Sequence, residues 1–394
     1  MSRRPVTIVI FSGFFLLGML FIMWGILLPD IAADLAMSEL VSGGFFLLFS
    51  VGMMLGAIIG GKYVSKFEFL PLLAVLCITD SVLLLVMAHL QHWQSMLAVV
   101  FVIGLVSSSI ITIGHTLIAR LYEEKRFAMM GIMDFMFSLG TFAASFYVTL
   151  VYSFALDWRW TIRIVVVMLL FLSLYTWLAA RSQKKQLAGQ PKAQGQTLKY
   201  SDVIRRPVFL LLALVSFGYG AVEFGNANWF VSYAQQGQGF SGDDSRYLLA
   251  FFTAGMVISR LTFSLCLRYF SIHRLTVIMT TMTLAGAAGI KLGDTFMQIG
   301  SFNLLLGLGL GGLFPLVLSS AMNIDPAKGP VLSGITIIGN SLGVQISSFS
   351  TGLWANFAPL TTAFWVIPLA AVWLWLAGWY FSRQLKAINL SAGH

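Results

Sequence analysis

Apolar runs of about 20 residues recur along the whole chain, separated by short polar segments. A helix needs about 20 mostly apolar residues to cross the hydrocarbon core of a bilayer. Twelve runs qualify, at approximately residues 7–29, 41–61, 70–88, 95–118, 129–152, 160–180, 208–233, 247–267, 275–291, 298–320, 332–355 and 361–381. The pattern therefore predicts an all-α, polytopic membrane protein with twelve transmembrane helices. The first run ends in Pro29-Asp30 and eleven more follow it, so we do not expect a cleaved signal peptide.

One polar segment divides the chain close to its middle. Residues 181–207 are rich in Gln, Gly and Lys, a composition typical of a solvated linker. We therefore expect three parts: an N-terminal six-helix bundle in residues 1–180, a cytoplasmic linker in residues 181–207 and a C-terminal six-helix bundle in residues 208–394.

Composition and charge support a membrane location. Only 10% of the residues are charged and 58% are hydrophobic, whereas soluble domains carry roughly 25% charged residues. The net charge is +9, and all but four of the 24 Lys and Arg residues fall on one side if the N-terminus is cytoplasmic. This asymmetry follows the positive-inside rule and predicts an inner-membrane protein with both termini in the cytoplasm. A nucleic-acid partner is not needed to explain the charge. The four exceptions are Arg159, Arg163, Arg246 and Lys291.

The two halves of the chain share short matches at a constant offset. Phe49–Gly56 matches Phe252–Ser259, Gly104-Leu105 matches Gly307-Leu308, and Ser138–Gly140 matches Ser341–Gly343, all 203 residues apart. Small residues four apart let helix backbones approach closely inside a membrane. The matches indicate a duplicated six-helix unit; the alternative is coincidence within a restricted apolar alphabet.

Motifs in five of the runs point to a known family. They are Trp24-Gly25 with Pro29 in the first run, Gly52 to Lys62 in the second, Gly218 to Glu223 in the seventh, Gly255 to Arg260 in the eighth and Gly307 to Pro315 in the tenth. With them the chain resembles the major facilitator superfamily over essentially its whole length. Within it, the chain is most similar to the fucose–galactose–glucose:proton symporter group and to TsgA-like permeases. The resemblance implies two pseudo-symmetric bundles with a solute site between them, and a protein that works as a monomer.

The chain departs from this family pattern at two places. Ser65 stands where the superfamily usually has an aspartate between the second and third helices, which weakens the expectation of the usual cytoplasmic gate latch. The fucose type has a carboxylate in the fourth helix, where this chain has Ile111-Thr112 ahead of His115. Proton coupling by that route is therefore not implied.

Glu223 lies deep in the seventh run, where ionisable groups are costly and are by default functional candidates. The Gly and Asn residues around it predict an interrupted helix that lines a cavity. A carboxyl group at this depth can take up and release protons near neutral pH. Asn226, Asn228 and Trp229 add amide groups and an aromatic face, a set suited to a polyhydroxylated solute. The alternative is a protonated Glu223 hydrogen-bonded to a neighbouring helix.

His115 and Asp134 lie near the adjoining ends of the fourth and fifth runs. They can pair as an inner gate or a proton relay, because histidine titrates near physiological pH. A structural helix–helix hydrogen bond is the alternative. We expect Asp80 in the third run to be structural. Asp30 and Asp34 are expected to be solvated loop carboxylates at the outer end of the first run, with a guard at the outer mouth as the alternative for Asp30.

Further polar side chains are candidates for binding the solute, although single polar groups between helices more often hold helices together. They are Trp24, Ser108, Thr112, Asn303, Asn340 and Gln345. The first, fourth, seventh and tenth runs carry no deep Arg or Lys. An anionic solute would normally require one, so we expect a neutral or weakly cationic solute.

The twelve spans, the family resemblance and the polar groups inside the spans together predict a secondary active transporter. It would move a small neutral, sugar-like solute, with proton symport through Glu223 assisted by His115 and Asp134. The alternatives are a proton-coupled exporter of a small metabolite or amphiphile, and a non-transporting membrane sensor or scaffold. No ATP-binding glycine loop and no hydrolytic constellation is present, so we do not expect an enzyme. The two cysteines and five histidines are scattered, and no metal or cofactor is expected. The expected partners are the solute, protons and the bilayer.

Overall fold

The computed structural model describes residues 3–63, 68–122, 125–187, 207–324 and 329–391, and all regular structure in these ranges is helical. Ten helical segments among them are long and apolar enough to cross a membrane. Two further helices, α9 (Gly242–Tyr269, 28 residues) and α13 (Gly329–Ala355, 27 residues), are as long but are not among the ten. Every run predicted from the sequence is therefore helical, although the tenth run is divided between α11 and α12 and the twelfth between α14 and α15.

The chain divides into two compact units, Met1–Gly195 and Gln196–His394. The predicted linker begins inside a helix, because α6 continues to Leu187. Residues 188–206 lie outside the described part of the chain, so the predicted linker and bundle boundaries stay predictions. The N-terminal unit contains α1 (Arg3–Asp34), α2 (Glu39–Tyr63), α3 (Phe69–Met87), α4 (Trp93–Leu121), α5 (Arg126–Ser153) and α6 (Trp158–Leu187). The C-terminal unit contains α8 (Pro207–Ser232), η2 (Tyr233–Gly237), α9, α10 (Ile272–Leu292), α11 (Phe296–Gly311), α12 (Leu313–Ile324), α13, α14 (Leu360–Ala363) and α15 (Val366–Ser391).

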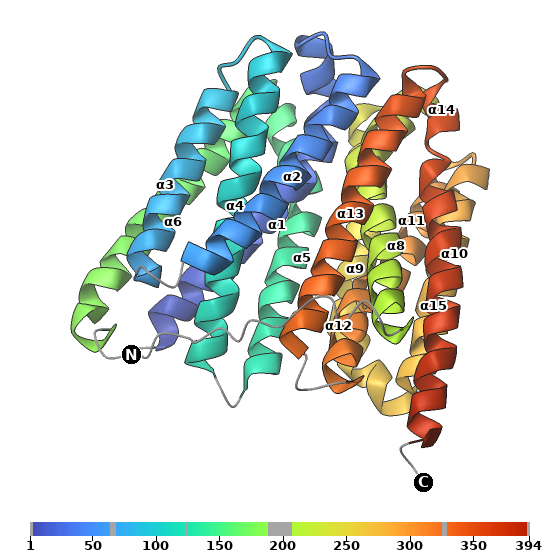
Figure 1. The fold of residues 1–394 in the computed structure, drawn as a ribbon. Helices are drawn as coiled ribbons and strands as arrows, with labels where there is room; N and C mark the ends of the chain where they lie inside the picture. The colour runs from blue at the N-terminus through green and yellow to red at the C-terminus, as the bar shows by residue number, and fades with distance from the viewer. Residues whose placement is uncertain (1–2, 64–67, 123–124, 188–206, 325–328, 392–394) are drawn as a thin grey trace. The chain divides into compact units, whose positions relative to one another are not determined.

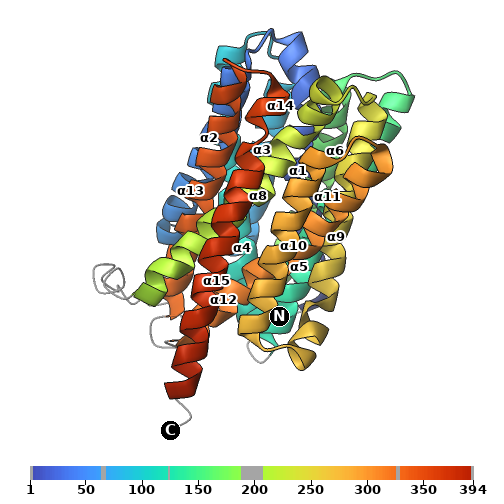
Figure 2. The same cartoon turned by 90° about the vertical axis from the view of Figure 1, so that its right-hand side faces the viewer.

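The two units use the same order of helix packing. In the N-terminal unit α1 packs on α5, α2 on α4 and α3 on α6 (Figure 1). In the C-terminal unit the corresponding partners are α8 with α13, α9 with α11 and α10 with α15, and Figure 2 shows α9, α10 and α11 running side by side. Each unit is thus a version of one six-span arrangement.

The repeated glycines lie where these helices cross. A Cβ added to Gly104 on α4 would overlap the carbonyl oxygen of Phe49 on α2, and one added to Gly307 on α11 would overlap that of Phe252 on α9. Both members of the second pair lie 203 residues after those of the first. Because only glycine permits this backbone approach, the repeat found in the sequence is a repeated helix contact.

The interruption expected near Glu223 is wrong. Helix α8 runs unbroken from Pro207 to Ser232, and its irregular turn comes later, as the π-helical η2. The tenth span is interrupted instead, with α11 ending at Gly311 and α12 beginning at Leu313. Pro315 explains this position, because its nitrogen carries no hydrogen and cannot donate to the carbonyl of Gly311 four residues earlier.

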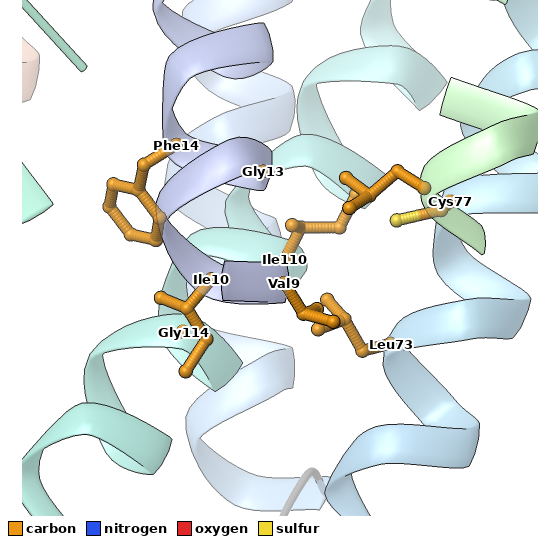
Figure 3. Close-up of a pocket in the computed structure, with 9 residues that line it drawn as sticks. Val9, Ile10, Gly13, Phe14, Leu73, Cys77, Ile110 and Gly114 are labelled. Atoms are coloured by element: carbon orange, nitrogen blue, oxygen red, sulfur yellow. The ribbon is translucent and has the colours of Figure 1, made fainter. Parts of the chain in front are cut away.

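A small cavity lies inside the N-terminal unit, between α1, α3, α4 and α6 (Figure 3). Gly13 and Gly114 leave the space, and Phe14 and Cys77 line it with apolar surface. Its volume of about 10 Å³ is close to the minimum for one water molecule. It is a packing defect and not a solute site.

The last helix of each unit exposes an apolar face that ends in a tryptophan–arginine pair. On α6 the guanidinium of Arg181 lies 3.4 Å from the ring centre of Trp177, and on α15 that of Arg383 lies 3.7 Å from Trp379. The pairs are 202 residues apart in sequence. Exposed apolar side chains such as Phe171 (68%) form the lipid-facing surface before the first pair. Tryptophan and arginine at the end of such a face are typical of the membrane interface.

Candidate functional site

Glu223 lies at the middle of the apolar span Phe209–Gly237 and forms an ion pair inside the C-terminal unit. Its Oε1 atom is 3.9 Å from a terminal nitrogen of Arg260 on α9, and both side chains are only 13% exposed. Tyr219 lies one helical turn before Glu223. Its hydroxyl interacts with the Glu223 carboxylate and with the Arg260 guanidinium. We call Tyr219, Glu223 and Arg260 the Glu223 cluster.

The close packing of α8 fixes the position of this cluster. Gly220 lies against Asn340 of α13, and Gly225 lies against Ser347 of the same helix. Tyr219 and Glu223, four residues apart, share another face of α8. The Tyr219 ring packs at 5.3 Å on the ring of Phe314, at the start of α12. The glycines in the seventh span thus permit helix packing and do not break the helix.

Arg260 also contacts the interruption of the tenth span. Its Nε atom donates to the carbonyl oxygen of Gly311 at 3.3 Å. The hydroxyl of the preceding residue, Ser259, accepts from the amide of Gly312 at 3.0 Å. The guanidinium therefore lies between a backbone carbonyl on α11 and a carboxylate on α8.

The charges in this cluster balance as long as Glu223 is ionised. Separating a buried ion pair is costly, because each charge is then left without its partner away from water. Protonation of Glu223 would remove the negative charge that Arg260 faces on α8. The cluster can therefore couple the binding of one proton to the hydrogen bonds that Arg260 makes.

A second polar chain connects three helices of the same unit. Asn226 donates to the side-chain oxygen of Asn303 on α11 at 3.1 Å, and Asn303 donates to the carbonyl of Leu248 on α9 at 3.2 Å. Both asparagines are fully buried. The side-chain oxygen of Asn226 has no hydrogen-bond partner, and so it is the acceptor of this pair that remains available.

The other predicted residues of the C-terminal unit lie along the contact of α8 with α13. Asn228 donates to the hydroxyl of Ser348 at 2.9 Å and Trp229 to its carbonyl at 2.9 Å. Asn340 has a buried side-chain oxygen with no partner, and Gln345 is buried on the same helix. Asn228 and Trp229 use their donors to join the two helices; their binding of a solute stays a prediction.

In the N-terminal unit, His115 and Asp134 approach each other across α4 and α5. Nε2 of His115 is 3.9 Å from Oδ1 of Asp134, and the side chains are 41% and 44% exposed. The other ring nitrogen of His115 lies 3.0 Å from the carbonyl of Ile111, and the ring meets the edge of Phe14 at 5.2 Å. The imidazole is thus held in place while its outer nitrogen faces the carboxylate.

The remaining predicted residues of this unit do not form one cluster. Trp24 is 1% exposed, packs on Phe45 and Phe49, and its ring nitrogen has no partner. Ser108 and Thr112 lie one turn apart on α4, where Thr112 donates to the carbonyl of Ser108 at 2.9 Å.

The other acidic residues have structural partners. Asp80 is fully buried and accepts from Ser107 at 3.5 Å. The expectation that Asp30 and Asp34 are solvated loop carboxylates is wrong, because both belong to α1. Asp30 accepts from the Tyr152 hydroxyl at 2.7 Å, and Asp34 pairs with Arg159 at 2.6 Å.

Sequence reasoning missed Arg260 as a site residue: Arg260 was counted among the cations of the cytoplasmic side and as the end of a family motif in the eighth run. The first, fourth, seventh and tenth spans carry no deep Arg or Lys in their own sequences, whereas Arg260 reaches the seventh span from the eighth. Pro315 was the available signal, since a proline in a membrane helix leaves a carbonyl that some neighbouring group must satisfy.

Repeated six-span units with lipid-facing apolar helices, and an ion pair inside one of them, define a multi-pass membrane transporter. The chain belongs to the major facilitator superfamily, whose family model matches residues 9–348. The predicted fold class and the predicted resemblance are therefore confirmed.

Individual relatives agree with this assignment. The chain is 22% identical to Protein TsgA of Salmonella typhimurium over 355 residues, which cover 89% of this chain and 88% of that protein. Among solved structures, it is similar to the nucleoside transporter NupG with a TM-score of 0.73 and 15% identity, covering 98% of this chain and 100% of that one. A bacterial homolog of the human lysosomal transporter Spinster, in an inward-facing and unoccupied conformation, gives a TM-score of 0.74 at 13% identity and covers 97% of each chain.

Proposed function

We propose that this protein is a secondary active transporter that moves a small neutral polar solute by alternating access, with proton symport through Glu223. The ion pair that Glu223, in the middle of the apolar span Phe209–Gly237, forms with Arg260 is the observation that carries the proposal. Intramembrane ionisable groups that pair with one another are typical of proton and substrate pathways.

The balance of charge in the Glu223 cluster supports a neutral solute. Arg260 brings a cation to the seventh span, but Glu223 neutralises it. The site therefore presents no net charge that would demand an anionic solute. The similarity to a nucleoside transporter suggests solutes rich in hydroxyl groups, and the amides of Asn226 and Asn340 are suited to bind them.

In this mechanism, proton binding and solute binding favour the same set of conformations. A proton on Glu223 changes the charge of the cluster, and solute and proton together stabilise one access state over the other by their difference in affinity. His115 and Asp134 serve as an auxiliary gate or relay in the N-terminal unit. We assign the protein to the inner membrane as a monomer with both termini in the cytoplasm.

Transport in proteoliposomes tests the proposal. A panel of labelled hexoses and nucleosides is offered with and without an imposed pH gradient. Glu223→Gln should abolish accumulation driven by the gradient and retain exchange of solute across the membrane. Glu68→Gln is the control, because Glu68 is an exposed carboxylate outside the spans. Unchanged accumulation in Glu223→Gln would exclude Glu223 from coupling. Movement of the solute only in the direction opposite to the imposed proton gradient would favour the exporter alternative.

A further inference from the structure

Two consecutive side chains of α9 bind the backbone groups exposed at the interruption between α11 and α12. Ser259 accepts from the amide of Gly312 at 3.0 Å, and Arg260 donates to the carbonyl of Gly311 at 3.3 Å. Because Pro315 has no N–H, the Gly311 carbonyl has lost its helical donor. A buried backbone carbonyl without a partner is costly, so Arg260 supplies the missing hydrogen bond.

The guanidinium of Arg260 contacts both this carbonyl and the carboxylate of Glu223. The distance of 3.9 Å to Glu223 is an ion-pair distance and longer than a direct hydrogen bond. Tyr219 interacts with both charged groups, and its ring packs on Phe314 just after the interruption. A negative Glu223 therefore draws the guanidinium toward α8, whereas a neutral Glu223 leaves it to Gly311.

The N-terminal unit serves as an internal comparison. The positions 203 residues before Arg260 and Pro315 are Ala57 and Thr112. There α4 is continuous from Trp93 to Leu121. The unit that lacks the proline also lacks the arginine, so cation and interruption occur together.

We propose that Arg260 is a positioning residue that transmits the protonation state of Glu223 to the interruption of the tenth span. This inference rests on the proposed function for the role of the proton. When Glu223 loses its proton, its carboxylate pulls Arg260 away from the Gly311 carbonyl, and the turn that joins α11 to α12 loosens. When Glu223 is protonated, Arg260 returns to the Gly311 carbonyl and the turn stiffens. The link gives the transporter a route from proton binding to the geometry of one helix.

Few other groups can compete for this role. Within the described residues, the charged or titratable groups that act on Glu223 are Arg260 and Tyr219. Of the elements packed on α8, α12 and α13 have no charged residue in their sequences. The cations of α15, Arg383 and Lys386, are exposed near the end of that helix.

Hydrogen–deuterium exchange on the full chain in nanodiscs tests the link, with peptides covering residues 308–318. Glu223→Gln imitates the protonated carboxyl and should slow exchange there about threefold to tenfold, the effect of strengthening one hydrogen bond. Arg260→Gln should speed exchange by a similar factor and make it insensitive to Glu223→Gln. Arg274→Gln is the control, because Arg274 is an exposed cation of α10.

Pro315→Ala provides a second test that keeps the ion pair. It restores an N–H for the Gly311 carbonyl, so exchange should be slow whether residue 223 is Glu or Gln. If Glu223→Gln abolishes coupled transport but leaves exchange unchanged, the link is wrong and the proposed function stands. If it changes exchange but not transport, the link stands and proton coupling through Glu223 is wrong. An effect of Glu223→Gln that persists in Pro315→Ala would also overturn the link.

Discussion

The carbonyl oxygen of Phe252 lies directly against the Cα atom of Gly307, where α9 crosses α11. Any side chain at Gly307 must push the two backbones apart, and overpacking a tight contact costs about 1–3 kcal/mol. We expect Gly307→Ala to lower the free energy of unfolding by about 2 kcal/mol, measured by denaturant unfolding in micelles. Gly104→Ala should have a similar effect at the equivalent crossing of α2 and α4.

Gly131→Ala is the matched control for these glycine substitutions. A Cβ at Gly131 on α5 meets no atom within 4 Å. Alanine favours a helix over glycine by about 1 kcal/mol, so this variant should be as stable as the wild type or more stable. Equal losses at Gly131 and Gly307 would show that the close crossing of α9 and α11 is not the cause of the loss.

Breaking the Glu223–Arg260 pair from one side should be costly. Removal of one partner from a buried ion pair typically destabilises by about 3–5 kcal/mol, because the other charge is left uncompensated. We therefore expect Arg260→Gln to be about 3 kcal/mol less stable at pH 7 than the wild type. The double variant Glu223→Gln with Arg260→Gln should recover part of that loss. A double variant that loses the sum of the single effects would show that the two residues act independently.

The sequence predicted the helices well because the membrane imposes a simple rule of length and hydrophobicity. Even the less apolar α9 and α13 were found, since each still contains an apolar run of about 20 residues. The interruption was placed in the wrong helix. Glycines predict either a break or a close contact, and the sequence does not distinguish the two; in α8 they serve close contacts, whereas in the tenth span Pro315 removes a hydrogen bond.

The candidate site was predicted less completely. Glu223 was identified because a carboxylate deep in an apolar run stands out against its surroundings. Arg260 and Tyr219 were not, because their role depends on which faces of α8 and α9 meet, and a long arginine can reach past several residues. The contacts of Asn228 and Trp229 with Ser348 depend on packing in the same way.

His115 and Asp134 are expected to affect the rate of transport more than its coupling. The pair is about two-fifths exposed and 3.9 Å apart, and exposed ion pairs typically contribute only about 0–1 kcal/mol. His115→Gln and Asp134→Asn should each change the initial uptake rate severalfold and leave the final accumulation ratio unchanged. If the pair is a gate, the double variant should behave like either single variant. A loss of accumulation in either variant would instead favour a proton relay.

The two tryptophan–arginine pairs should make the protein sensitive to anionic lipid. The ion pairs found in the described residues involve neither Arg181 nor Arg383, and Trp177 and Trp379 beneath them are 42% and 38% exposed. A guanidinium stacked on an indole directs its N–H groups outward, where a lipid phosphate can accept them. Each basic residue near an anionic surface contributes about 1 kcal/mol.

Phosphatidylglycerol in phosphatidylcholine nanodiscs should therefore raise the thermal stability of the wild type, and replacing both arginines by Gln should remove most of that increase. Lys386→Gln is the comparison, because Lys386 is also an exposed cation of α15, and it should remove less of the increase than the double arginine variant. Stabilisation that survives in the double arginine variant would show that the pairs do not bind the lipid.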